Sequence, residues 1–158
     1  MSFNGVRSFR YALLFEIGAN ASGFIPALLM PETALSFLVK NPNMITPATT
    51  SLMQWFGVLV ATGFTIPLIL CYPNPVPSQG GSEQIVAWRR LTYMMFGAGE
   101  VGLGTMMMIQ WLQGDSGLSE NALLMGMLAM GAFSLMRAFF LYVRPSWMEG
   151  QANVKKAM

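Results

Sequence analysis

The sequence predicts an all-α integral membrane protein, a single four-helix transmembrane bundle with both termini in the cytoplasm. Four long apolar runs at residues 11–30, 52–72, 91–112 and 122–143 are the first observation. Each run is close to the roughly 20 residues that a helix needs to cross the hydrocarbon core. Composition agrees, because 54% of residues are hydrophobic and only 10% are charged, whereas soluble domains contain about 25% charged residues.

Polar or helix-breaking residues bound each run. Arg10 precedes the first run and Pro31 ends it. The second run ends at residues 73–82, whose proline, glycine and serine content predicts a flexible linker. The third run ends at a Gly-Asp-Ser-Gly turn, and the fourth is followed by residues 146–158, which we expect to form a cytoplasmic tail.

Loop charges predict the orientation. The loop between the first two runs, residues 31–51, carries only Lys40. The basic residues of the opposite side are Arg7, Arg10, Arg89, Arg90, Arg144, Lys155 and Lys156. Because lysine and arginine accumulate on the cytoplasmic side, this bias places both termini there. Arg89 and Arg90 are expected to anchor this topology, and for a eukaryotic source we expect the endoplasmic reticulum membrane.

Several classes of site are excluded by composition. The chain has no histidine and one cysteine, so histidine-ligated haem or zinc, histidine-based triads and dithiol redox chemistry are excluded. Any chemistry is expected to be cofactor-independent. A net charge of +2 gives no basis for a nucleic-acid partner. The expected partners are the lipid bilayer and a lipophilic small molecule, and the sequence leaves a homo-oligomer open.

Three of the four runs contain a deep ionisable residue: Glu16, Glu100 and Arg137. A charge at the bilayer centre costs at least about 2.5–3.5 kcal/mol on insertion scales, so such residues usually have a partner or a function. At 1.5 Å per residue, Glu16 and Arg137 lie at matching depths, about five and six residues from the cytoplasmic ends of their spans. We therefore expect these two residues to form an ion pair, whereas Glu100 lies deeper.

Helical periodicity places further polar, small and apolar side chains on the same faces as these three residues. Together they predict a polar pocket that extends from the cytoplasmic third of the bundle towards its centre. The expected substrate-binding residues are Asn20, Tyr93, Gly97, Met130 and Phe133. The alternative reading of the glycines is tight helix packing, and the alternative for the ionisable residues is a structural salt-bridge network.

Two carboxyl groups in different environments can supply the acid and the base of one reaction. Burial disfavours the charged form of a carboxyl, so Glu100, without a basic neighbour at its depth, is expected to act as general acid. Glu16 is expected to act as base or electrostatic stabiliser, with Arg137 as its orienting partner. Asn20 and Tyr93 would orient a water or a substrate oxygen. This set suits protonation of an epoxide, alkene or enol in a lipophilic substrate, followed by hydrolysis or cyclisation.

The segments Phe15–Asn20, Gly97–Glu100 and Met136–Phe140 carry a resemblance. Their arrangement resembles the small four-span membrane enzymes of fungal polyketide and terpenoid biosynthesis, including membrane-bound epoxide hydrolases. It is also similar to the larger integral-membrane terpene cyclases, which use acidic residues and no metal. The resemblance implies a multi-pass hydrolase or cyclase of secondary metabolism.

Other functions are compatible with the same residues. Small multidrug exporters also have four spans with a glutamate in the first, and a proton-coupled transporter is one alternative. A non-catalytic membrane scaffold or subunit is another, in which Glu16, Glu100 and Arg137 only pair with one another; exchanging the charges of Glu16 and Arg137 would then restore function. A glutathione-dependent membrane enzyme would need more deep basic residues than Arg137.

Overall fold

The structure is a computed structural model that describes residues 5–73 and 82–149. These residues form helices and no strand, apart from an isolated bridge between Val39 and Leu118, so the expected all-α class is confirmed. The helical segments are α1 (Gly5–Leu29), α2 (Pro31–Leu38), η1 (Pro42–Met44), α3 (Pro47–Leu59), η2 (Val60–Thr65), α4 (Ile66–Cys71), α5 (Ser82–Gln113), α6 (Glu120–Ala138), η4 (Phe139–Val143) and α7 (Ser146–Glu149). Most of the expected linker at 73–82 and of the expected tail at 146–158 lies outside the described residues.

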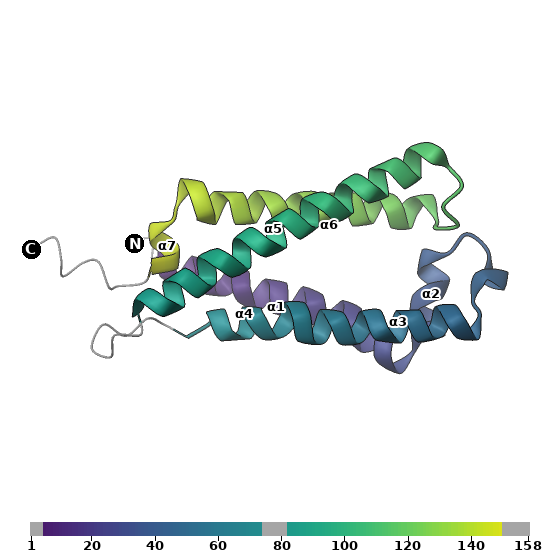
Figure 1. Ribbon diagram of the computed structural model, residues 1–158, viewed down its shortest axis with the longest axis horizontal. Coiled ribbons are helices and arrows are strands. Elements are labelled where there is room, and N and C mark those ends of the chain that lie inside the picture. The colour runs from purple at the N-terminus through teal and green to yellow at the C-terminus, as the bar shows by residue number, and fades with distance from the viewer. Residues whose placement is uncertain (1–4, 74–81, 150–158) are drawn as a thin grey trace, which may run out of the picture.

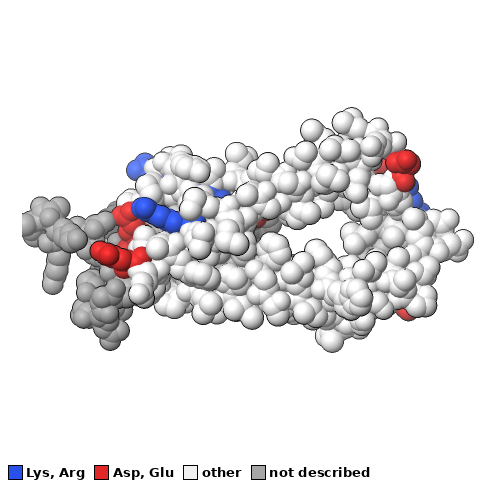
Figure 2. All heavy atoms as spheres, viewed as in Figure 1, with Lys and Arg blue, Asp and Glu red and all other residues white. Residues whose placement is uncertain are grey.

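Among the described residues, three helices are long and apolar enough to cross a membrane: Gly5–Leu29, Pro47–Cys71 and Glu120–Val143. They match the first, second and fourth expected runs, as an integral multi-pass membrane protein requires. The third run lies within α5, which has 32 residues but carries Arg89, Arg90 and Glu100. Figure 2 shows most of the charged side chains gathered at the two ends of the molecule, with a mostly uncharged belt between them.

The long helices form two antiparallel pairs (Figure 1). One pair consists of α1 with the continuous rod α3–η2–α4, and the other consists of α5 with α6. Glycines allow close approach in both pairs. A Cβ at Gly57 would lie 3.0 Å from the side chain of Leu28, and one at Gly126 would lie 2.7 Å from Sδ of Met107. In Figure 1 the pairs meet at the end that holds both termini and diverge towards the other end.

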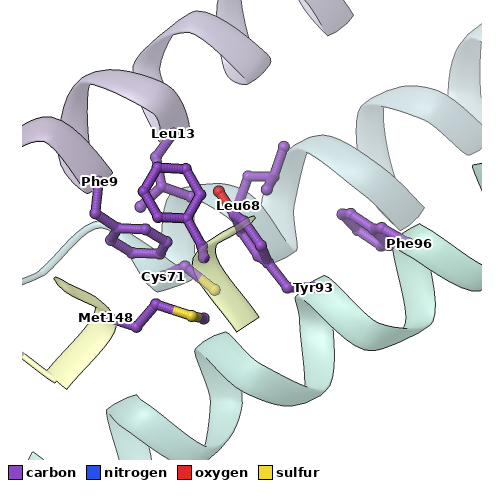
Figure 3. Close-up of a cluster of buried hydrophobic side chains, with 8 residues drawn as sticks. Phe9, Leu13, Leu68, Cys71, Tyr93, Phe96 and Met148 are labelled. Carbon is purple, nitrogen blue, oxygen red and sulfur yellow. The ribbon is translucent and has the colours of Figure 1, made fainter. Parts of the chain in front are cut away.

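The core fills the end where the two pairs meet (Figure 3). Phe9 and Leu13 of α1 pack there with Cys71 of α4, Tyr93 of α5 and Met148 of α7, and all five are fully buried. The Phe9 ring lies 5.4 Å from the Tyr93 ring between centroids. The first residues of the expected tail are thus α7, a short helix that closes the core.

The other end of the bundle is joined by its two loops. The backbone N–H of Lys40 donates to the carbonyl of Gly117 at 2.9 Å, and that of Ser119 donates to the carbonyl of Leu38 at 2.7 Å. The ammonium of Lys40 also donates to the carbonyl of Gly114 at 2.8 Å. These bonds tie the α2–α3 connection to the α5–α6 turn, so the diverging helix pairs are linked again at their tips.

A π-helical segment, η2, interrupts the second long rod. Pro67 has no backbone N–H, and the wider turn lies immediately before it. The hydroxyl of Thr65 donates to the carbonyl of Val60 at 2.9 Å and so satisfies one acceptor within the segment. A second π-helical segment, η4, begins two residues after Arg137. η4 thus follows Arg137 in the chain, and Val60 and Phe64 of η2 line the same cavity as Arg137.

Candidate functional site

Arg137 is the centre of a buried ionic cluster that joins three long helices. Its Nε donates to both carboxylate oxygens of Glu100, at 2.8 and 2.9 Å, and its Nη2 lies 2.8 Å from Oε1 of the same carboxylate. The hydroxyl of Ser134 lies 3.5 Å from the second oxygen, at the limit of a hydrogen bond. Both oxygens of Glu100 are therefore held by the guanidinium from α6.

The same guanidinium also contacts Glu16 of α1. Nη2 of Arg137 lies 2.7 Å from Oε2 of Glu16, so the expected ion pair is confirmed. This is the contact of Oε2 with the cluster. Oε1 of Glu16 accepts a hydrogen bond from the Tyr93 hydroxyl at 2.7 Å. Each oxygen of Glu16 thus has one close contact, whereas Glu100 has several with the same guanidinium.

The cluster corrects the expectation for Glu100. The sequence predicts that Glu100 has no basic neighbour at its depth, but this prediction was wrong, because Arg137 contacts both of its oxygens. Glu16, Glu100 and Arg137 are 1%, 8% and 4% exposed. Two carboxyl groups thus share one guanidinium in a buried site, and with both ionised the cluster carries one uncompensated negative charge. A buried net charge has a high desolvation free energy, and binding of one proton would neutralise this charge.

A cavity of about 240 Å³ lies against the cluster, and all four long rods contribute to its wall. Glu16, Glu100 and Arg137 line it together with the expected residues Asn20, Met130 and Phe133. The Asn20 amide makes no hydrogen bond to any described residue, so it is available to a bound molecule. Figure 2 shows the molecule hollowed on its flank, between α3 below and α5 above, rather than at either end.

Two of the expected substrate-binding residues do not line this cavity. Tyr93 is fully buried in the core, and its hydroxyl holds Glu16 in place. Gly97 lies against the side chain of Arg137, since a Cβ there would be 3.7 Å from its Cδ. Both residues therefore contact the ionic cluster.

The sequence interpretation missed the aromatic wall of the cavity. Phe56 of α3, Phe64 of η2 and Phe96 of α5 line it beside the carboxyl groups. The rings of Phe64 and Phe96 lie 5.0 Å apart between centroids. The second span has no acidic or basic residue to mark its inner face, so only its phenylalanines at 56 and 64, about two helical turns apart, carry a signal.

The charge on Arg137 also lies near two aromatic rings. Its guanidinium carbon lies 4.8 Å from the centroid of Tyr93 and 5.1 Å from that of Phe96. Such cation–π contacts favour the charged guanidinium in an apolar site. Its Nη1, however, has no hydrogen-bond partner among the described residues. In the part of the chain that the structure describes, no group of three histidine, cysteine, aspartate or glutamate residues could hold a metal ion.

Comparison with protein-family models, with curated proteins and with solved structures found no match. The feature that bears on function is the geometry of this site: two carboxyl groups share one guanidinium at the wall of a mostly apolar cavity.

Proposed function

We propose that this protein is a cofactor-independent membrane enzyme that opens an epoxide in a lipophilic substrate by acid–base catalysis. The observation that carries the proposal is the Glu16–Arg137–Glu100 cluster, with one carboxyl group in excess, at the wall of the cavity of about 240 Å³. When one extra proton is bound, the cluster has no net charge. One of its two carboxyl groups is then a carboxylic acid, and the other is a carboxylate. Those are the two groups that opening an epoxide requires.

The contacts favour Glu16 as the acid, the reverse of the roles expected from the sequence. Both oxygens of Glu100 accept hydrogen bonds from Arg137, which favours the ionised form. Glu16 has fewer contacts with the guanidinium, since only its Oε2 lies near one nitrogen of Arg137. We therefore assign the excess proton to Glu16, where it lies at the cavity wall, and assign Glu100 as the base.

In this mechanism Glu16 donates its proton to the epoxide oxygen as the carbon–oxygen bond breaks. A water attacks the carbon, and its proton passes to Glu100, which gives a diol. When a hydroxyl of the substrate attacks instead, the same transfers give a cyclic ether. The Asn20 amide orients the attacking oxygen. The cluster regains its starting state when a proton leaves Glu100 and a proton returns to Glu16.

Two features favour an enzyme over a transporter. The buried core that includes Phe9, Tyr93 and Met148 fills one end of the bundle, and the loop contacts of Lys40 join the other end. A transported molecule would need a path through at least one of these ends. A substrate from the bilayer needs only the flank, where Figure 2 shows the hollow.

The test is turnover by membranes that carry the wild type, Glu16→Gln or Glu100→Gln. Each is incubated with lipophilic epoxides, some with an internal hydroxyl, in isotopically labelled water. We expect a labelled diol or an unlabelled cyclic isomer, detected by mass spectrometry, and a loss of about 10²–10⁴-fold in either variant. Glu120→Gln is the matched control, because Glu120 is exposed in the first turn of α6.

Two results would contradict the proposal. One is wild-type activity that both glutamine variants retain. The other is no turnover of any epoxide in a broad panel by protein that is folded.

We also propose that α5 is a fourth span and that both termini are cytoplasmic, in the endoplasmic reticulum of a eukaryotic source. The charge bias supports this, since Arg10, Arg90 and Arg144 lie at the end with the termini and Lys40 lies at the other. A glycosylation acceptor inserted beside Lys40 should be modified, and one fused to the C-terminus should not. Modification of the C-terminal acceptor would refute this topology.

A further inference from the structure

A second cavity, of about 350 Å³, lies near the loop-joined end of the bundle. Its wall comes from α2, α3 and the turn before α6, and most of it is hydrocarbon: Leu35, Val39, Leu52, Met53 and Leu118 contribute. No acidic or basic side chain is among its lining residues. This cavity can hold an apolar group but offers nothing to a charged one.

Phe56 borders both cavities. Among the described residues that line them, it alone belongs to both walls. Its neighbour Trp55 lines neither cavity, although both side chains are exposed, Phe56 at 53% and Trp55 at 69%. Position 56 is therefore the place where a change in side-chain size tests whether the two spaces communicate.

The two cavities together follow a long stretch of one rod. The lining residues extend along α3 and η2 from Thr49 to Phe64, which corresponds to roughly 20 Å of helix at 1.5 Å per residue. One leaflet of a bilayer has a hydrocarbon thickness of about 15 Å. The combined space is thus long enough for an extended hydrocarbon chain of the length found in membrane lipids.

The charged side chains that line this combined space are all in one of its two cavities. All of its ionisable side chains, Glu16, Glu100 and Arg137, lie in the first cavity, and the second cavity has only the hydroxyls of Thr49 and Ser116 as polar side chains. Such an arrangement matches a molecule with a polar reactive group at one end and an apolar chain at the other. The hollow on the flank in Figure 2 gives such a molecule a route from the bilayer.

We propose that the second cavity is a subsite for the hydrocarbon tail of the substrate, and that Phe56 determines the chain length the enzyme accepts. This rests on the proposed function, because it places the epoxide at Glu16 and Glu100. The substrate class is then a long-chain epoxide that carries its oxygen near one end.

The test uses binding, so that it does not depend on turnover. The probes are terminal epoxides of unbranched alkanes, one short and one long, with a photoreactive diazirine at the far end. Each is bound to purified full-length protein in lipid nanodiscs, with Glu16→Gln to prevent consumption, and the cross-linked peptides are identified by mass spectrometry. The proteins compared carry Phe56 unchanged, Phe56→Ala, Phe56→Trp or the matched control Trp55→Ala.

We expect the long probe to label residues 49–53 and 116–118, and the short probe to label the first cavity. Phe56→Trp should reduce labelling by the long probe about tenfold or more, because an overpacked wall excludes the tail. Phe56→Ala should keep or increase that labelling, and Trp55→Ala should leave it unchanged. Equal labelling in all four proteins, or no labelling of residues 49–53 and 116–118, would overturn the subsite.

The failures of the two proposals are distinguishable. Labelling that depends on Phe56, combined with no turnover of any epoxide, leaves the subsite standing and removes the enzymatic assignment. Turnover that is independent of chain length, combined with no labelling of the second cavity, leaves the enzyme standing and removes the subsite.

Discussion

Replacement of Arg137 by methionine is expected to lower the free energy of unfolding by about 3–5 kcal/mol and to abolish turnover. The substitution removes every ion-pair contact of Glu16 and Glu100, which are 1% and 8% exposed. Two carboxyl groups would then face one another in an apolar site without a cation. Removal of one partner from a buried ion pair has costs of this size.

The triple variant Glu16→Gln, Glu100→Gln, Arg137→Met should recover most of the lost stability but no activity. Neutral side chains of similar size remove the uncompensated charge, and replacing a buried ionic cluster by neutral groups is often neutral or stabilising. The acid and the base are absent, however, so an enzyme cannot recover. A scaffold whose three residues only pair with one another would recover function together with stability.

Cys71 provides the measurement. It is the one cysteine of the chain and is fully buried in the core, so a thiol-reactive fluorophore reports unfolding in detergent micelles. Arg144→Met is the control, since Arg144 is exposed and lies 6.0 Å from the Trp147 ring in a weak cation–π contact. An Arg137→Met protein as stable as the wild type would show that the cluster is not needed for the fold.

Depth along a helix was sufficient to predict the Glu16–Arg137 pair but not the Glu100 contact. Counting residues compares positions of Cα atoms along the membrane normal. It ignores the length of an arginine side chain, which can reach a partner one helical turn away. It also ignores the oblique course of α5 across the bundle, visible in Figure 1, which changes the depth of every residue on that helix.

Hydropathy predicted the three most apolar spans to within six residues at each end, because their length and composition are properties of each segment alone. The aromatic wall of the cavity depends instead on which faces of the helices pack against one another. A uniformly apolar segment has no helical periodicity of polar and apolar residues that would identify its inner face. Phe56 and Phe64 were therefore missed, whereas Met130 and Phe133 were found because Arg137 marks their face.

The neighbouring residues Arg89 and Arg90 also differ in a way that the sequence does not predict. The sequence assigns both to the cytoplasmic interface as topology anchors. Arg90 fits, since it is half exposed and pairs with Glu149 at 2.6 Å. Arg89 is fully buried, one helical step away, so adjacent identical residues have opposite environments. Counting the charged residues of a loop does not show which of two adjacent arginines is buried.

Replacement of Arg89 by methionine is expected to destabilise the protein by at least about 3 kcal/mol. Its three nitrogens donate to the backbone carbonyls of Cys71 at 2.8 Å, Met148 at 2.6 Å and Pro73 at 2.7 Å. Its guanidinium also lies over the Phe9 ring, 5.0 Å from the centroid. The substitution leaves the buried carbonyls of Cys71 and Met148 without this donor, each at a cost of about 1–3 kcal/mol, and also frees the partly buried carbonyl of Pro73.

The control is Arg90→Met, which removes the same chemical group from the neighbouring position. Arg90 forms an exposed ion pair with Glu149, and such pairs contribute about 0–1 kcal/mol. Unfolding is followed by tryptophan fluorescence, because Cys71 adjoins the altered site. Arg89→Lys should be intermediate at best, since one ammonium cannot reproduce the planar fork of donors. Equal stability of the Arg89 and Arg90 variants would mean that these three carbonyl contacts do not hold α4, α5 and α7 together.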